Sequence, residues 1–341
     1  MVRDKRGSWG RAFVFLALVL LLGAVTGCGA RPASEVTPAA TRSREGEASP
    51  VPTMTVSPPP STATTPTQTP TQKATSTPAP LPTASLTARS TATEEVKTVT
   101  FTIVYDNNAC AAAKTEDLRT AWGFGCWIVA EETTVLFDTG GDGATLLHNM
   151  GEVGLDPLDI DAVVLSHAHG DHTGGLGALL NAGARPTVYI PASFPRSFKA
   201  DVRAHTHVVE VTDPTSIGPG MYTTGEVGTG IREQALAVET AEGLVVVTGC
   251  AHPGVDTMAR RAWTHFGDDI ALVMGGFHLG GASRARVEGI IADFRDMGVE
   301  CVAPCHCTGD AARRLFKEAY GEHCTLAGVG WSTEFLLAGK D

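Results

Sequence analysis

Residues 167–172 read His-Ala-His-Gly-Asp-His and follow the apolar run 162–165 after one serine. In an extended segment, residues i and i+2 point to the same side, so His167 and His169 can bind one metal ion together. Asp171 and His172 follow a glycine turn and can face a second position. Imidazole and carboxylate suit zinc, manganese or iron, and two such ions can lie about 3.5–4 Å apart. The pattern predicts one or two divalent metal ions, zinc before manganese or iron.

Three later turns carry a histidine directly after an expected strand. They are residues 249–254 with His252, residues 275–281 with His278, and residues 304–309 with His306. Strand ends hold ligands firmly and leave one side open. His252 and His306 are thus placed where a strand end could hold a ligand, and His278 is an extra ligand, a substrate contact, a general acid or a structural histidine.

Asp138 ends an earlier apolar run and is followed by Thr-Gly-Gly. One interpretation is that its carboxylate supports the metal site by accepting a ring N–H from a histidine ligand, which fixes the tautomer. The alternative is an N-cap for the helix expected after Gly143.

The pattern His-x-His-x-Asp-His after a strand resembles the signature of the metallo-β-lactamase-fold hydrolase superfamily. Residue patterns alone indicate an α/β or α+β fold, but the resemblance implies a four-layer αββα sandwich of two mixed sheets flanked by helices. It also implies two ligand sets, the first made of His167, His169 and His252 and the second of Asp171, His172 and His306. Asp138 would then lie beneath the metals.

The sequence departs from the superfamily at Cys250. There the superfamily usually has a strand-terminal Gly-Asp-Thr whose aspartate bridges both metals, whereas this chain has Gly249-Cys250. No histidine lies between His207 and His252 in the sequence, which makes His252 the remaining candidate ligand. Cys250 is either a thiolate ligand or a buried structural cysteine beside the site. The number of metals therefore stays open.

Further motifs, at residues 105–108, 122–126, 249–254, 275–279 and 304–309, resemble one branch of the superfamily. The branch takes its label from an archaeal 7,8-dihydropterin-6-methyl-4-(β-D-ribofuranosyl)aminobenzene-5'-phosphate synthase. This resemblance is specific for the branch and weak for the reaction, because one scaffold carries many chemistries.

The resemblance implies a hydrolase in which metal-activated water attacks a phosphoester or acyl-type small molecule. Asp171 would accept the proton of the attacking water and His278 would donate one to the leaving group. Two alternatives stay open: a pterin-related synthase-like enzyme of the same branch, and a non-catalytic metal- or solute-binding lipoprotein.

The first 27 residues have the pattern of a secretory signal peptide, with a basic start and an apolar stretch at 12–25. Those 14 residues are short for a membrane-spanning helix, which needs roughly 20. Residues 25–28, Val-Thr-Gly-Cys, resemble a bacterial lipobox, which implies lipidation of Cys28 and a membrane-anchored, extracytoplasmic protein. An uncleaved membrane anchor, the alternative, also places the remaining chain outside the cytoplasm.

Residues 28–96 are rich in Pro, Thr, Ser and Ala and predict a disordered tether, because they cannot bury enough apolar surface to offset the entropy of ordering. Residues 97–341 are about 245 residues, enough for one domain with a large core. The formal charge of −11 and the lack of a basic stripe disfavour nucleic acid and leave a small-molecule substrate as the expected partner.

Periodicity within the domain predicts strands and helices in mixed order. The expected strands are 98–105, 125–130, 134–138, 161–166, 187–190, 208–211, 221–227, 234–239, 244–248, 270–274 and 300–303; the expected helices are 142–153, 173–182, 194–204, 256–266, 283–297 and 310–320. Because residues 244–248 are apolar without alternation, we expect that strand to be buried on both faces.

Overall fold

The computed structural model describes residues 97–113, 115–267 and 269–339. The predicted signal peptide (1–27), the predicted lipidation site Cys28 and the predicted tether (28–96) lie outside the described residues. Among the helices of the described part, none is long and apolar enough to cross a membrane.

The first sheet has seven strands and is mixed. Its strands β1, β2, β3 and β13 pair antiparallel, and β3 to β6 pair parallel. The spatial order is β13 (Ser332–Leu336), β1 (Thr98–Asp106), β2 (Phe124–Ala130), β3 (Thr133–Phe137), β4 (Ala162–Val164), β5 (Thr187–Pro191) and β6 (Val208–Val211).

The second sheet has six strands and is also mixed. Its strands β10, β11 and β12 run parallel, and the others pair antiparallel. The spatial order is β12 (Cys301–Cys305), β11 (Ile270–Gly276), β10 (Gly243–Thr248), β9 (Leu236–Thr240), β8 (Met221–Thr223) and β7 (Thr215–Gly218).

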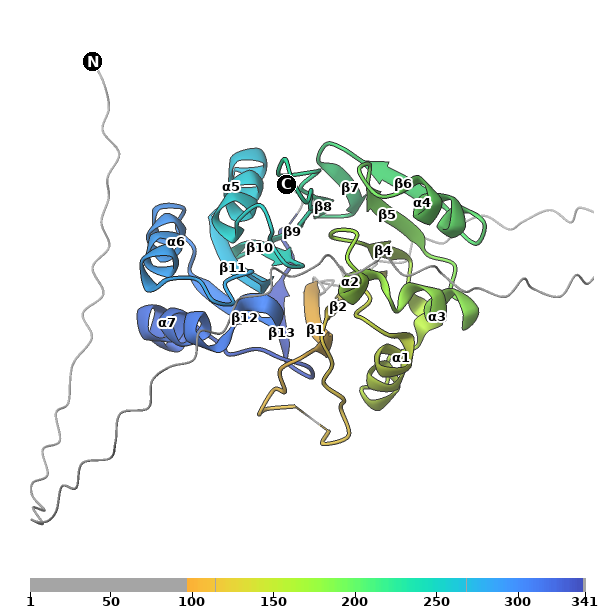
Figure 1. The fold of residues 1–341 in the computed structure, drawn as a ribbon, viewed down its shortest axis with the longest axis horizontal. Coiled ribbons are helices and arrows are strands. Elements are labelled where there is room, and N and C mark those ends of the chain that lie inside the picture. Colours follow the sequence, from red (N-terminus) through yellow and green to blue (C-terminus); the bar gives the residue numbers. More distant parts are fainter. Residues whose placement is uncertain (1–96, 114, 268, 340–341) are drawn as a thin grey trace, which may run out of the picture. The chain divides into compact units, whose positions relative to one another are not determined.

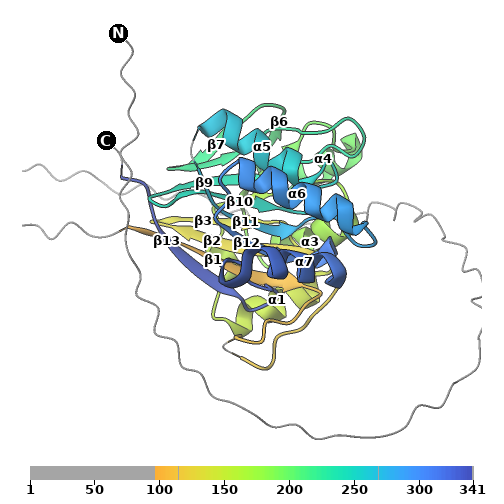
Figure 2. The ribbon, with the colours of Figure 1, turned by 90° about the vertical axis from the view of Figure 1, so that its left-hand side faces the viewer.

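Helices cover the outer face of each sheet (Figures 1 and 2). On the seven-stranded sheet these are α1 (Gly143–Glu152), α3 (Leu176–Asn181) and α4 (Arg196–Arg203); on the six-stranded sheet they are α5 (Val255–Phe266), α6 (Arg284–Asp296) and α7 (Asp310–Tyr320). A short helix, α2 (Gly170–Thr173), follows the turn after β4. The predicted fold of two mixed sheets flanked by helices is confirmed.

Strand β10 shows why its sequence lacks alternation. Val245 and Val247 point into the core between the sheets, whereas Leu244 and Val246 point into the core beneath the outer helices. All four side chains are 0% exposed. A strand between two apolar layers needs apolar residues on both faces, as the sequence predicted.

The predicted helix 173–182 is wrong at its start, because the chain forms α2 and α3 as separate helices joined at Gly174 and Gly175. A Cβ on Gly174 would lie 2.1 Å from the Gly141 carbonyl oxygen, and one on Gly175 would lie 2.1 Å from the Thr139 carbonyl oxygen. These glycines let the segment pack directly against the turn after β3.

One strand prediction also needs correction, and two strands were not predicted. The strand expected at 221–227 ends at Thr223, because the chain turns at Gly225 with φ +73°. The sequence also gave no prediction for β7 or for the edge strand β13.

Candidate metal centre

The candidate residues gather where strands of both sheets end. Asp138 follows β3 and residues 167–172 follow β4, while His278 follows β11 and His306 follows β12. Asp138, His278 and His306 have positive φ angles of 57°, 51° and 45°. Such backbone is unfavourable for residues with a Cβ and clusters at functional sites, where surrounding packing maintains it.

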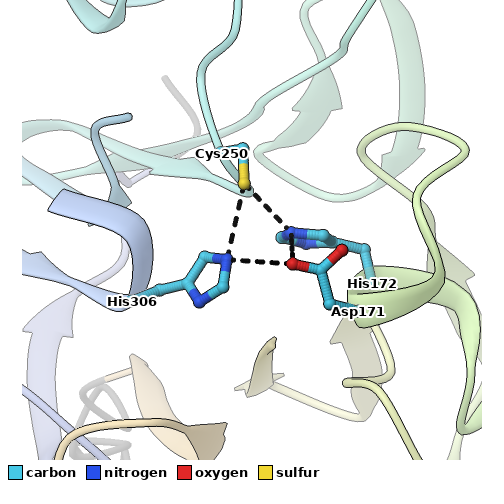
Figure 3. A group of neighbouring side chains, drawn as sticks. All are labelled: Asp171, His172, Cys250 and His306. Atoms are coloured by element: carbon cyan, nitrogen blue, oxygen red, sulfur yellow. Dashed lines mark hydrogen bonds and ion pairs between the residues drawn. The ribbon is translucent and has the colours of Figure 1, made fainter. Parts of the chain in front are cut away.

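Four side chains form the first donor group, drawn in Figure 3: Asp171, His172, Cys250 and His306. The Cys250 Sγ atom lies 3.2 Å from His172 Nε2 and 3.4 Å from His306 Nε2. The Asp171 Oδ2 atom lies 3.6 Å from His172 Nε2 and 3.5 Å from His306 Nε2. One carboxylate oxygen, one sulfur and two imidazole nitrogens thus surround one small space.

The second donor group consists of His167, Cys250 and His252, whose donor atoms all lie within 4.8 Å of one another. His169 adjoins it, with its Nδ1 3.0 Å from His167 Nε2 and its ring centroid 4.9 Å from that of His252. Five of the six predicted metal ligands therefore lie in these two groups, Asp171, His172 and His306 in the first and His167 and His252 in the second, and the sixth, His169, lies beside the second. Cys250 belongs to both groups.

Asp138 lies beneath the first donor group and is fully buried. Its Oδ2 accepts from His172 Nδ1 at 2.7 Å, and its two oxygens also accept from the Ser166 backbone N–H and hydroxyl at 2.7 Å each. The bond to Nδ1 leaves His172 Nε2 directed at Cys250. The N-cap alternative for Asp138 is wrong, because Asp142 caps α1 by accepting from Thr145 N.

His306 is fixed in a similar way by the end of β1. Its Nδ1 donates to the Asn107 side-chain oxygen at 2.9 Å, and its backbone N–H donates to the buried Asp106 carboxylate at 3.0 Å. The free Nε2 therefore points toward Cys250 and Asp171. Asp106 and Asn107 were seen in the sequence only as part of a branch motif.

Glu233 is the main residue that the sequence did not reveal. It is fully buried, and its carboxylate accepts from three consecutive backbone N–H groups, those of Cys250, Ala251 and His252, at 2.8, 2.8 and 2.9 Å. Ala251 has a positive φ of 60°. Glu233 thus holds the strained turn that presents two donor residues, and its signal in the sequence was an acidic residue just before β9.

A 3-10 turn brings Cys307 to the candidate metal centre. In an extended segment neighbouring side chains point to opposite sides, which would put Cys307 opposite His306, but residues His306–Thr308 form a 3-10 turn. As a result Cys307 lies with Cys250 and His278, their donor atoms within 4.8 Å of one another. The His278 ring also packs on His252, with centroids 4.1 Å apart. All seven cysteines of the described part are free thiols, Cys110 and Cys126 included.

Burial sets the charge of the histidines in the second group. It lowers the pKa of His252 to about 3, with a further contribution from His278, and it lowers the pKa of both His167 and His169. Neutral imidazoles are the form that binds metal, so these side chains need lose no proton on binding.

The first group is electrostatically different. Burial disfavours the charged form of His172, but the carboxylates of Asp138, Asp171 and Glu233 together outweigh this and raise its pKa to about 9. Burial would raise the pKa of Asp171, but its hydrogen bond with His306 and the charge of His172 hold it well below the usual range. Asp171 is therefore ionised and can serve as a ligand or a proton acceptor.

The residues fit divalent metal ions. His252 Nε2 is buried without a hydrogen-bond partner, a costly state for a polar atom unless something else, such as an ion, completes it. The donors are imidazole, thiol and carboxylate, the set that zinc prefers. Each of the two donor groups places at least three such donor atoms within 4.8 Å of one another, enough to hold one ion.

Comparisons with known proteins agree with this geometry. The sequence model of the metallo-β-lactamase superfamily matches residues 126–275. The solved structure of Tm1679, described as a metal-dependent hydrolase of the β-lactamase superfamily, aligns with a TM-score of 0.58 at 27% identity, covering 70% of this chain and 99% of that one. The domain is similar to the metallo-β-lactamase superfamily in both sequence and fold.

Two further proteins are similar to this domain. The metallo-β-lactamase-fold protein YhfI of Bacillus subtilis shares the fold, with a TM-score of 0.53 at 18% identity over 70% of this chain and 99% of that one. The 7,8-dihydropterin-6-methyl-4-(beta-D-ribofuranosyl)-aminobenzene-5'-phosphate synthase of Methanocaldococcus jannaschii is 27% identical over 234 residues, 55% of this chain and 80% of that protein.

Proposed function

We propose that the domain is a metal-dependent hydrolase of the metallo-β-lactamase superfamily, acting on a phosphoester or acyl-type small molecule. The observation that carries the proposal is the pair of donor groups that meet at Cys250, together with the buried and unpartnered Nε2 of His252 in the second group. Burying several polar groups together lowers the stability of the folded protein, and a bound metal ion would offset that cost.

The metal ligands in this proposal form two sets that share Cys250: His167, His169 and His252 in one, and Asp171, His172 and His306 in the other. Bound divalent metal lowers the pKa of a water molecule toward neutrality and polarises the group under attack. Zinc is favoured over manganese or iron, because a thiolate donor suits zinc and manganese prefers oxygen.

Two side chains are proposed to move protons. Asp171 keeps its side chain 21% exposed, and its carboxylate can accept the proton of the attacking water. His278 is exposed and packs on His252, and its hydrogen bond with Cys307 raises its pKa. A protonated His278 imidazole can therefore donate to the leaving group.

The test is metal analysis followed by a substrate panel. Purified protein should carry one or two zinc ions per chain and hydrolyse at least one of a set of phosphodiesters, lactones, thioesters and β-lactams. Chelation should abolish the activity and zinc should restore it. A metal-loaded protein that cleaves no member of the panel contradicts the hydrolase proposal, and binding of a ligand without turnover would identify a binding lipoprotein instead.

A second candidate is a synthase-like reaction on a pterin-related substrate. It is favoured by the similarity to the archaeal synthase across 80% of that protein. Incubation of metal-loaded protein with dihydropterin and ribosyl-aminobenzene phosphate precursors, with product detection by mass spectrometry, decides between the two candidates. A condensed product favours the synthase, and its absence beside hydrolysis of the panel favours the hydrolase.

We also propose that the protein is lipidated at Cys28, so that residues 28–96 tether the domain outside the cytoplasm. The support is the lipobox-like Val-Thr-Gly-Cys at residues 25–28 and the Pro/Thr/Ser-rich sequence that follows it. Expression in a bacterial host with radiolabelled palmitate should label the wild-type protein, and C28A should abolish both label and membrane association. Labelling of C28A would contradict the proposal.

A further inference from the structure

Trp122 is exposed at the edge of the candidate metal centre. Its side chain is 59% exposed, yet its ring lies against the His306 ring, with centroids 4.8 Å apart and an angle of 52° between the planes. His306 itself is only 2% exposed. The indole therefore covers part of one ligand and leaves most of its own apolar surface in solvent, which contributes nothing to folding.

The loop that carries Trp122, between β1 and β2 (Figure 1), is held in place by a buried residue. Asn149 of α1 is fully buried; its side-chain oxygen accepts from Arg119 N at 2.8 Å, and its amide donates to the carbonyls of Arg119 and Val104 at 2.9 Å each. Ala121 N donates to the Asp106 carbonyl at 3.1 Å. The exposure of Trp122 is thus not the result of an unanchored loop.

Close packing also ties Trp122 to the residues that carry the donors. A Cβ on Gly123 would lie 2.4 Å from the Asp171 carbonyl oxygen, and a Cβ on Gly141 would lie 2.8 Å from the Trp122 carbonyl oxygen. Both positions accept only glycine, so the backbones touch there. Trp122 is therefore fixed relative to Asp171 on one side and His306 on the other.

We propose that Trp122 determines substrate specificity by stacking on a planar aromatic or heteroaromatic ring next to the scissile bond. A fixed, exposed indole beside a polar reaction centre offers a flat π-face, which favours planar rings over aliphatic groups of equal size. The inference rests on the proposed function in that the substrate binds at this metal centre.

The experiment uses two non-hydrolysable ligands of equal charge and similar size, phenylphosphonate and cyclohexylphosphonate. Calorimetry on the metal-loaded protein should show phenylphosphonate binding about 5- to 10-fold tighter. W122F should keep most of that preference and W122L should lose it, although leucine still covers His306. L158A, which alters a 60% exposed leucine before β4, whereas the ligand turn follows that strand, is the control and should keep the preference.

The same variants give a kinetic readout on any aryl substrate found in the panel. W122L should raise KM several-fold and leave kcat within about 2-fold, because the stacking contact forms equally in ground and transition states. Equal binding of the two phosphonates by wild-type protein, binding of neither, or an unchanged preference in W122L overturns the inference.

The two proposals fail separately. Preference for phenylphosphonate without hydrolysis of any substrate supports the role of Trp122 and contradicts the hydrolase. Hydrolysis of a panel substrate without a preference for phenylphosphonate supports the hydrolase and contradicts the role of Trp122.

Discussion

The two sheets supply the candidate metal centre in different ways. The seven-stranded sheet contributes four donor residues from one continuous turn after β4, His167, His169, Asp171 and His172. The six-stranded sheet contributes from separate strand ends, with Cys250 and His252 after β10 and His306 after β12. The first half of the site, from the seven-stranded sheet, is therefore local in sequence. The second half, from the six-stranded sheet, forms only when its parallel strands have assembled.

Each half also has its own buried carboxylate, and the two act on different targets. Asp138 accepts from a ligand ring, that of His172, and so fixes one tautomer. Glu233 accepts from three backbone N–H groups and so fixes the shape of a turn. We infer that the first half depends on side-chain orientation and the second on backbone conformation. This difference predicts separate effects of mutation on catalysis, stability and metal affinity.

The largest expected effect follows from Asp171, which contacts ligands from both halves. D171A should lower kcat by at least about 1,000-fold, because it removes a metal donor and the proposed proton acceptor together. Steady-state kinetics on the best panel substrate measure this. D201A, on the exposed face of α4, is the matched control and should retain full activity. Normal turnover by D171A would exclude the assigned role.

The next effect concerns the second half and is one of stability. E233A should lower the free energy of unfolding by about 3 kcal/mol or more, because three buried N–H groups lose their acceptor. E233Q keeps one acceptor oxygen and should lose less. Urea denaturation of metal-free protein measures both. If E233A unfolds at the wild-type urea concentration, the turn does not depend on this carboxylate.

The pH dependence of stability tests Glu233 independently. Burial raises its pKa from an ordinary 4.5 to about 7. The folded state then binds a proton that the unfolded state has released, so stability falls as pH rises through that interval, by up to about 1.4 kcal/mol per pH unit. Metal-free wild-type protein should lose stability relative to E233Q between these two pH values. Parallel curves for the two proteins would contradict the raised pKa.

A smaller effect distinguishes two neighbouring buried thiols. Cys250 lies in both donor groups, whereas Cys307 lies with Cys250 and His278 only. C250S should weaken zinc binding by about 10- to 100-fold, because a hydroxyl replaces a thiolate donor. C307S should change it less, and zinc titration with a competing chelator compares them. Unchanged zinc affinity in C250S would show that the sulfur of Cys250 is not a ligand.

The local half of the site could be predicted from sequence because its residues share one turn. The spacing of His167 and His169 on an extended segment already indicated a common ligand set, and the structure places them 3.0 Å apart through their ring nitrogens. The distant half required the resemblance to a known family. Nothing in the spacing of His252 and His306 brings them together; the parallel pairing of β10, β11 and β12 does.

Glu233 could not be predicted because its partners are backbone groups 17 to 19 residues away. In sequence it follows Arg232 and precedes Gln234, which is typical of a solvated loop. Similarly, the break between α2 and α3 depends on the turn at Thr139 and Gly141 packing against two glycines. Both are consequences of tertiary contact, which periodicity does not record.

The smallest effect compares Asp138 with Asp142, which stand four residues apart but serve different structures. Asp142 caps α1 by accepting from Thr145 N at 2.8 Å, and it accepts from the Tyr105 hydroxyl at 2.8 Å. D142A should therefore cost about 1–2 kcal/mol of stability, the usual value of a lost cap with a second hydrogen bond. It should leave zinc affinity unchanged, since Asp142 contacts no donor residue.

D138N should show the opposite pattern, with zinc affinity reduced about 10-fold through the His172 ring. Thermal unfolding of metal-free protein and zinc titration, applied to both variants, test the pair. If D142A weakens zinc binding as much as D138N does, the cap of α1 is coupled to the ligand turn. Asp138 would then act by stabilising the whole turn after β3. In that case Asp138 and Glu233 would both support the backbone, and the contrast drawn between them would not hold.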